Sequence, residues 1–271
     1  MINRTLYITK CNGMSSILFE ISGQTAFITL NRPDKLNSFN REMSLLLQEK
    51  LALCSTSPEV RCVYITGAGK GFSAGQDLAE VTDPAGPGME KILSEQYNPI
   101  IHAIRELPKP VVAAVNGVAA GAGANMALCC DVVIASDAAS FIQAFSKIGL
   151  IPDSGGTYTL PRLIGWQKAS GIMMLGDKIP AAEAERIGMI YKVIPQQDFS
   201  EESKKIAATL AQLPTKALGY IKQVLNQSAA NTLDEQLALE DRIQRQAAAT
   251  SDFTEGVQAF LEKRLPVFRG E

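Results

Sequence analysis

The chain has 271 residues, 46% of them hydrophobic, and its 26 Lys and Arg nearly balance its 28 Asp and Glu, giving a net charge of −2. This balance excludes the basic stripe of a nucleic-acid-binding protein, and no apolar run approaches the roughly 20 residues of a membrane span. Five cysteines, an odd number, argue against a disulfide framework and indicate a reduced, cytoplasmic protein of one large domain or one domain with a small appendage.

The first part of the chain predicts two paired strands and then a helix. Residues 1–15 carry no clear pattern, and we expect them to form a mobile tail. Residues 17–21 and 25–30 predict strands joined by a Ser-Gly-Gln turn. Apolar residues at helical spacing over 41–53 predict a helix, and the apolar run 60–66 predicts a buried strand that ends at a glycine-rich loop.

The middle of the chain predicts a long helix and two further buried strands. Residues 89–107 are expected to be helical, with a kink at Pro99. The loop before this helix, residues 81–89, is rich in glycine and proline and is expected to be mobile. Buried strands are predicted over 111–115 and 132–135.

From residue 155 onwards the pattern is mainly helical, interrupted by a short strand over 190–194. Strand pairs and helices followed by a helical tail depart from a simple alternating βα pattern, so periodicity alone does not select one α/β architecture. Four helices are predicted in this last part of the chain, over 204–213, 216–228, 233–250 and 254–263.

A glycine-rich turn follows the strand over 111–115 and leads into the helix-forming run 125–128. Such a turn presents unpaired backbone N–H groups at the positive end of a helix, an arrangement that holds a developing oxyanion. Downstream, Asp153 is a lone carboxylate in the turn Ile-Pro-Asp-Ser-Gly-Gly. An oxyanion hole and one acid/base carboxylate are enough to move a proton next to a thioester carbonyl. Two other interpretations stay open: the glycines could serve tight packing, and Asp153 could cap the next helix.

Spacing and composition argue against several other chemistries. The turn lacks the third glycine of a dinucleotide-binding fingerprint, because Met126 occupies that position. Residues 67–73 contain glycines and a lysine but not in the order of a phosphate-binding loop, since no Lys-Ser or Lys-Thr pair is present. His102 is the single histidine of the sequence. One histidine is too few for a histidine-rich metal site and leaves only this residue for a Ser-His-Asp triad. Its neighbours place it on a helix face, and no metal is expected.

Three long strings occur in the order GKGFSAGQDL, AAVNGVAAGAGANMALCCD and GLIPDSGGTYTLPRLIG. They resemble the enoyl-CoA hydratase/isomerase (crotonase) family, and the resemblance covers the chain from about residue 16 to the C-terminus. It implies an α/β fold in which a right-handed spiral of ββα turns, residues 16–199, carries the active site. Residues 200–271 would form a C-terminal helical module for oligomerisation, in a trimer or a dimer of trimers (a hexamer), although their amphipathic pattern would also fit a monomer.

In that family two backbone N–H groups point at the thioester oxygen, and the resemblance assigns them here to Gln76 and Ala122. Hydratases of the family use two glutamates, whose positions are occupied here by Asn125 and Phe145. Neither residue can act as a general acid or base, so the resemblance argues against hydration. Isomerases of the family carry a carboxylate where Asp153 stands, and an apolar neighbour such as Phe145 would raise its pKa by desolvation.

Within the family, the best match is to members that isomerise a ring epoxide of phenylacetyl-CoA in bacterial phenylacetate breakdown, in the strings AFSKIGLIPDSGGT and GQDL. The implied function is an acyl-CoA isomerase that acts on a ring epoxide, forming an oxepin, or on a β,γ-double bond. Coenzyme A would be part of the substrate, with no separate cofactor. The alternatives are an enoyl-CoA hydratase, a hydrolase with Asp153 as nucleophile, and a non-catalytic protein that binds coenzyme A thioesters.

Contacts to coenzyme A are also implied by the resemblance. Lys35 and Lys263 are chemically suited to phosphate, although without the family match they would be ordinary solvated lysines. Tyr97 and the run 173–175 could line an acyl pocket, but such residues are more often core. The implied substrate contacts are Lys35, Leu36, Ala74, Asp77, Leu78, Gly121, Phe260 and Lys263, the last two from the C-terminal helix of this chain or of a neighbour.

Overall fold

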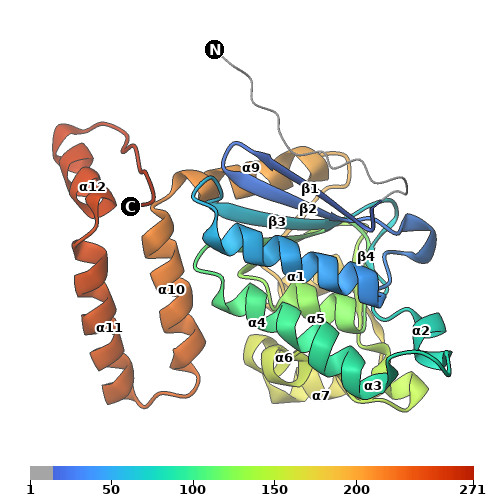
Figure 1. The fold of residues 1–271 in the computed structure, drawn as a ribbon. Helices are drawn as coiled ribbons and strands as arrows, with labels where there is room; N and C mark the ends of the chain where they lie inside the picture. The colour runs from blue at the N-terminus through green and yellow to red at the C-terminus, as the bar shows by residue number, and fades with distance from the viewer. Residues whose placement is uncertain (1–14) are drawn as a thin grey trace.

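A six-stranded sheet in the order β1-β2-β3-β5-β7-β10 lies at the centre of the computed structural model, which describes residues 15–271 (Figure 1). β1 and β2 pair antiparallel, and the other neighbouring strands are parallel. The tail expected over residues 1–15 falls outside the described residues, except for Ser15. The strands are β1 Ile17–Ser22, β2 Thr25–Leu30, β3 Cys62–Gly67, β5 Val111–Val115, β7 Val132–Ser136 and β10 Lys192–Ile194.

The central strands are buried on both faces, which explains why their sequences are nearly continuous apolar runs. In β3, Cys62 and Tyr64 pack on the face covered by helix α9 (Phe199–Gln212). The alternate residues of the same strand face the larger core cluster, which includes the buried side of α1 (Arg41–Thr56). The two-residue period of the strand therefore divides the core into two layers.

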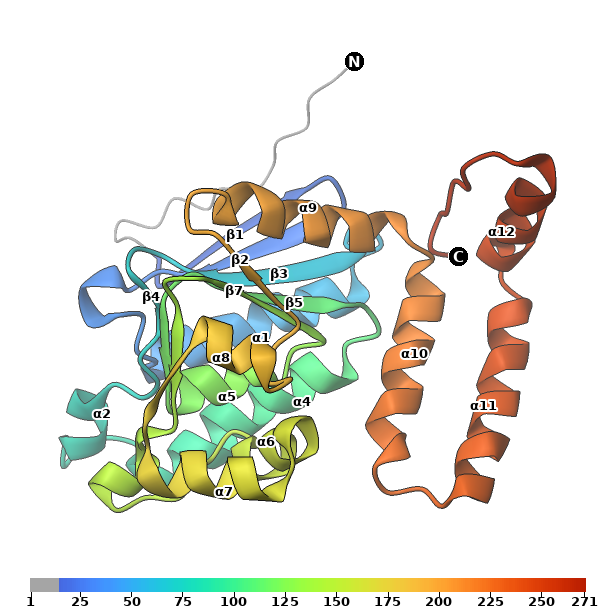
Figure 2. The same cartoon turned by 180° about the vertical axis from the view of Figure 1, so that it is seen from behind.

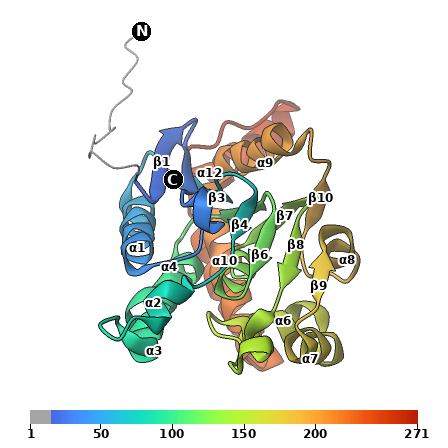
Figure 3. The ribbon, with the colours of Figure 1, turned by 90° about the vertical axis from the view of Figure 1, so that its right-hand side faces the viewer.

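A second sheet of four short strands, in the order β4-β6-β8-β9, adjoins the first (Figure 3). Each of β4, β6 and β8 follows a strand of the large sheet and is followed by helices, so the chain makes successive ββα turns as the resemblance implied. The sequence did not predict these strands, because three residues are too few to show an apolar period. They are β4 Gly71–Ser73, β6 Val118–Ala120, β8 Ser140–Ile142 and β9 Lys178–Pro180.

The helix predicted over 89–107 is present but contains an irregular turn. It begins as α3 (Gly88–Lys91), continues as a π-helical segment (Ile92–Tyr97) and ends as α4 (Asn98–Glu106). Pro99 follows the π-helical segment in the first turn of α4. Because a proline ring clashes with a regular preceding turn and lacks an N–H, the wider turn in front of it accommodates it. The predicted irregularity is confirmed, but it lies in the turn before Pro99.

The chain after β6 supplies further core helices and a helical arm. The core helices are α5 Ala122–Leu128, α6 Gly156–Ile164, α7 Trp166–Leu175 and α8 Ala181–Arg186. The arm consists of α10 Thr215–Ser228, α11 Leu233–Ala248 and α12 Ser251–Glu262, which extend beside the core (Figure 2). The four helices predicted over 204–263 are confirmed, with ends shifted by a few residues. No helix within residues 15–271 is long and apolar enough to cross a membrane.

The division of the chain at residue 200 stays a prediction. In the structure α9 lies against the sheet, with Ala207 and Ala211 in its buried core, and α10 is the first helix to leave it. Lys222 of α10 is buried and its Nζ donates to Asp131 Oδ2 at 2.8 Å. Burial lowers the pKa of Lys222, which the negative charge of Asp131 opposes, so this ion pair fastens the arm to the core.

Candidate active site

The turn after β4 directs one backbone N–H away from its neighbours. Phe39 forms an isolated parallel bridge with Gln76: Phe39 N donates to Gly75 O at 2.7 Å, and Asp77 N donates to Phe39 O at 2.8 Å. In this pattern the N–H and C=O of Gln76 point away from Phe39, and the Gln76 N–H donates to no group within residues 15–271. Gly75 has a φ of 86°, a conformation that glycine adopts without strain.

A second N–H lies next to the first. Gly121, with a φ of 51°, donates its own N–H to Ile142 O at 2.9 Å and turns the chain into α5. Ala122 is therefore the first helical residue, where an N–H has no acceptor inside the helix. A Cβ placed on Gly75 would lie 3.3 Å from Ala122 N, so the two predicted amides are on adjacent backbone segments. This arrangement can hold an oxyanion.

Asn125, at a position where hydratases of the family carry a glutamate, supports the Asp153 turn. Its side chain is fully buried, and its Nδ2 donates to Asp153 O at 2.9 Å. Gln143 Nε2 donates to Asn125 Oδ1 at 2.7 Å, which fixes the orientation of the amide. Gly156 N donates to the same Asp153 O at 2.8 Å. The backbone of Asp153 is thus held from two sides, a role for Asn125 that the sequence did not predict.

The Asp153 carboxylate is half-buried beside this support. Ser154 Oγ donates to Asp153 Oδ1 at 2.9 Å. Burial raises the pKa of Asp153, and the hydrogen bond from Ser154 opposes the rise. The interpretation of Asp153 as a helix cap is wrong, because Gly155 is the N-cap of α6 and no side chain caps it. The Asp153 carboxylate therefore does not cap α6.

Phe145 occupies the position that the resemblance assigns to the second glutamate of the hydratases. It packs on the turn that precedes α5. It is 6% exposed, and its ring lies 3.7 Å from the position that a Cβ on Gly121 would take. Phe145 therefore forms an apolar wall beside the turn that leads to the Ala122 N–H.

Of the residues considered for an acyl pocket, Tyr97 is the fully buried one. Its ring centroid lies 6.1 Å from that of Phe39, which pairs with Gln76. Met174 and Leu175 are instead 75% and 64% exposed on α7. Met173 packs partly against the core. The structure therefore packs Tyr97 against the residue that pairs with Gln76 and leaves Met174 and Leu175 on the surface.

Five of the implied coenzyme A contacts gather on adjoining segments, where Ala74 N donates to Leu36 O at 2.9 Å. Arg32, which the sequence did not single out, donates to Asp77 Oδ2 at 2.8 Å. Burial alone would raise the pKa of Asp77, but the bonds from Arg32 and from the Ala79 N–H lower it overall. This group consists of Lys35, Leu36, Ala74, Asp77 and Leu78, and Leu78 begins α2 (Leu78–Thr82).

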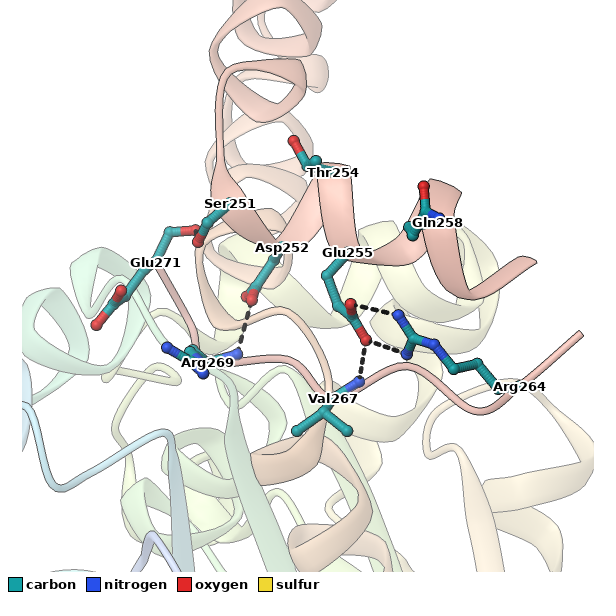
Figure 4. A pocket seen from close by; sticks show the side chains of 9 residues that line it. All are labelled: Ser251, Asp252, Thr254, Glu255, Gln258, Arg264, Val267, Arg269 and Glu271. Atoms are coloured by element: carbon teal, nitrogen blue, oxygen red, sulfur yellow. Dashed lines mark hydrogen bonds and ion pairs between the residues drawn. The ribbon is translucent and has the colours of Figure 1, made fainter. Parts of the chain in front are cut away.

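Of the other three implied contacts, Gly121 precedes α5, whereas Phe260 and Lys263 lie at the end of α12, at the opposite end of the molecule from α2 (Figures 1 and 2). Phe260 is 82% exposed. The chain therefore does not bring Phe260 and Lys263 to its own site. Near them a surface hollow of about 660 Å³ separates α12 from the C-terminal segment (Figure 4). Two residues that line the hollow form an ion pair, in which Arg264 donates to Glu255 at 2.6 and 2.8 Å. This pair fastens the C-terminal segment to α12.

Within residues 15–271, no three or more His, Cys, Asp or Glu side chains are grouped to hold a metal ion. His102 lies exposed on α4, with its Nδ1 3.2 Å from Glu106 Oε1, as its sequence context predicted.

Known proteins match this chain over nearly its whole length. The sequence model of the family described as Enoyl-CoA hydratase/isomerase matches residues 20–271. A 1,2-epoxyphenylacetyl-CoA isomerase of Escherichia coli is 47% identical over 95% of this chain and all of its own length. A probable enoyl-CoA hydratase of Rhodobacter capsulatus is 46% identical over 94% of this chain and 98% of its own.

Solved structures match the fold as well. The crystal structure of a putative enoyl-CoA hydratase/isomerase from Mycobacterium abscessus superposes with a TM-score of 0.89 at 35% identity, covering 94% of this chain and 100% of that one. An enoyl-CoA hydratase from Polaromonas gives a TM-score of 0.87 at 36% identity, over 93% of this chain and 99% of that one. The spiral core with its helical C-terminal part is therefore shared with these proteins.

Proposed function

Because this chain belongs to the enoyl-CoA hydratase/isomerase family, we propose that it is an isomerase of coenzyme A thioesters with Asp153 as its acid/base group. The observation that carries the proposal is the Asn125 amide, whose Nδ2 donates to Asp153 O at 2.9 Å. A position that would hold a catalytic glutamate in a hydratase thus supports the backbone of Asp153, which carries a different carboxylate. The name of the Escherichia coli relative, an isomerase, favours the same class of reaction.

In the proposed reaction the thioester oxygen accepts hydrogen bonds from Gln76 N–H and Ala122 N–H. Asp153 removes a proton from the α-carbon, and the two N–H groups stabilise the resulting enolate. Asp153 then returns the proton to another carbon, so the reaction needs neither water nor a second carboxylate. Because burial raises the pKa of Asp153, its carboxylate is a stronger base than an exposed one and its acid form persists to higher pH.

A ring-epoxide thioester is the substrate we favour. In such a substrate the C–C bond shared by the epoxide and the six-membered ring would break while both C–O bonds stay, which gives an oxepin. Asp153 would move the α-proton to a ring carbon through the same enolate. In a β,γ-unsaturated thioester, the second candidate, the proton would move from the α-carbon to the γ-carbon. Both reactions use the same two amides and the same carboxylate, and the Escherichia coli relative's name supports the first.

Hydration is the alternative suggested by the name of the Rhodobacter capsulatus relative. It requires a group that activates water, and the two glutamate positions hold an amide committed to Asp153 and a phenylalanine. Loss of such a group costs about 10²–10⁴-fold in rate. We therefore expect hydration of an α,β-unsaturated acyl-CoA to be slower than isomerisation by at least this order.

Turnover of both candidate substrates in deuterated water tests the proposal. The parent protein should isomerise one of them and incorporate deuterium, and Asp153→Asn should lose about 10²–10⁴-fold in kcat while still binding the thioester. Asp241→Asn is the matched control, because Asp241 is an exposed carboxylate on α11. Isomerisation by Asp153→Asn at the parental rate would overturn the assignment. Thioester binding by the parent without any exchange would favour the non-catalytic alternative.

We also propose that the chain forms a homo-oligomer, a trimer or a dimer of trimers. Its arm exposes large apolar side chains that water does not favour, with Phe260 and Leu265 82% and 88% exposed. In such an assembly, Phe260 and Lys263 would reach the coenzyme A site of a neighbour. Light scattering should give three or six times the chain mass of 29.1 kDa. A monomer at micromolar concentration would contradict the proposal.

A further inference from the structure

Tyr97 is fully buried, yet its hydroxyl has no hydrogen-bond partner within residues 15–271. Buried polar groups are nearly always bonded, so an unpartnered one needs an explanation. Tyr97 is also the last residue of the π-helical segment Ile92–Tyr97, and such turns inside helices occur frequently at functional sites. Two independent features of the fold therefore converge on this side chain.

Two contacts link the helix of Tyr97 to the segment of Gln76 and to the turn that carries Asp153. Its ring packs against Phe39, the residue that pairs with Gln76. Four residues further on, Ile101 lies on the same face of the helix. A Cβ on Gly155, two residues after the proposed catalytic carboxylate, would be 3.6 Å from Ile101 Cγ2. The helix that carries Tyr97 therefore contacts both the segment of Gln76 and the turn that follows Asp153.

The charges around the hydroxyl determine its form. Burial raises the pKa of Tyr97 well above its usual value, and the negative charges of Asp153, Glu80 and Asp77 raise it further. The phenol therefore keeps its proton at neutral pH. In that form it is a neutral hydrogen-bond donor that has no acceptor within residues 15–271.

We propose that the Tyr97 hydroxyl donates a hydrogen bond to an oxygen that the bound acyl group carries beyond its thioester carbonyl. Tyr97 is then a specificity-determining residue that favours oxygen-bearing acyl groups over plain hydrocarbon ones. The inference rests on the proposed function, because it takes a coenzyme A thioester as the ligand. An oxygen on the ring, as in the substrate named for the Escherichia coli relative, is an acceptor of this kind.

Binding of two thioesters that differ by one ring oxygen tests this inference. Calorimetry would compare 2-hydroxyphenylacetyl-CoA with phenylacetyl-CoA, for the parent and for Tyr97→Phe, which removes only the hydroxyl. One net hydrogen bond corresponds to about a 3–10-fold difference in Kd. The parent should favour the oxygen-bearing ligand by this factor, and Tyr97→Phe should bind both equally.

Tyr64→Phe is the matched control. The Tyr64 hydroxyl is also buried, but it is 2.9 Å from Ser203 Oγ on the α9 face of the sheet. This variant should lower Tm, because a hydrogen bond is lost, and should keep the parental ligand preference. Tyr97→Phe should leave Tm unchanged or raise it, because the hydroxyl it removes has no partner. A structural role for Tyr97 would instead give a lower Tm and an unchanged preference.

The outcomes separate this inference from the proposed function. Equal affinity of the parent for both thioesters, or the same preference in Tyr97→Phe and parent, would overturn the role of Tyr97 alone. Failure of the parent to bind either thioester would overturn the proposed function and this inference with it. A preference that disappears only in Tyr97→Phe supports the inference whichever reaction the enzyme catalyses.

Discussion

The proposed active site and the C-terminal arm are held together in different ways. At the site, the buried amides of Asn125 and Gln143 bind each other and the backbone of Asp153 inside the core. The arm leaves Phe260 and Leu265 largely exposed, and its C-terminal segment is fastened by Asp252, whose carboxylate is 3% exposed. The support of the proposed catalytic carboxylate therefore lies within the core of one chain, whereas the arm presents apolar surface that one chain does not cover.

The largest effect is expected from moving the oxyanion amides. In Gly75→Ala the new Cβ would lie 2.8 Å from Ala120 O and 3.3 Å from Ala122 N, at a φ of 86° that disfavours a side chain. The two backbone segments must separate, so kcat for isomerisation should fall by about 10²–10³-fold. Gly23→Ala is the control, because Gly23 has a φ of 55° and a Cβ there meets nothing within 4 Å. An equal loss in both variants would mean that backbone strain alone, and not the oxyanion hole, was responsible.

A smaller loss is expected when the support of Asp153 is removed. Asn125→Ala deletes the bond to Asp153 O, so the carboxylate is held less accurately and kcat should fall by about 10–10²-fold. The Kd of the acyl-CoA should change little, because the substrate is not expected to touch Asn125. Asn226→Ala is the comparison variant: it deletes a 2.9 Å bond to Arg105 O, between α10 and α4, and should spare kcat. Equal kcat in these two variants would remove Asn125 from the site.

Removing the Asp252 carboxylate should lower the stability of the protein and leave kcat for isomerisation unchanged. The Asp252 carboxylate accepts from Arg269 N at 2.6 Å and Gly270 N at 2.7 Å. Asp252→Ala leaves both donors unpaired and should lower the free energy of unfolding by about 1–3 kcal/mol in a urea titration. In Asp241→Ala, which breaks an exposed ion pair with Arg245, the loss should be below about 1 kcal/mol. If kcat in Asp252→Ala fell as far as in Gly75→Ala, the site and the arm would not be separate.

The smallest effect concerns stability at the site itself. Because burial raises its pKa above the ordinary 3.8, Asp153 binds a proton more tightly in the folded chain than in the unfolded chain. Its ionisation therefore opposes folding: the cost is absent below the ordinary pKa, grows as pH rises and is complete above the raised pKa. Asp153→Asn cannot ionise, so near pH 7 its Tm should exceed that of the parent, and below pH 4 the difference should vanish. A lower Tm near pH 7 would contradict the sign of this argument.

Structural features that depend on neighbouring residues in the chain could be predicted from the sequence. The apolar runs that became β3, β5 and β7 are long enough to show burial, and the arm helices carry a clear period. The glycine-rich turn before Ala122 predicted a free N–H, and the structure places it beside the segment of Gln76. The three-residue strands of the second sheet left no such signal, although they position both amides.

The sequence by itself determined the family, the helical arm, the absence of hydratase glutamates and the presence of a carboxylate at position 153. Only the tertiary structure decided that this carboxylate is half-buried and does not cap α6, that Asn125 holds its backbone, and that Arg32 pairs with Asp77. It also decided that the Tyr97 hydroxyl is buried without a partner. The physical reason is that hydrogen bonding and burial depend on which distant segments meet in space, and residues far apart along the chain carry no periodicity that announces their contact.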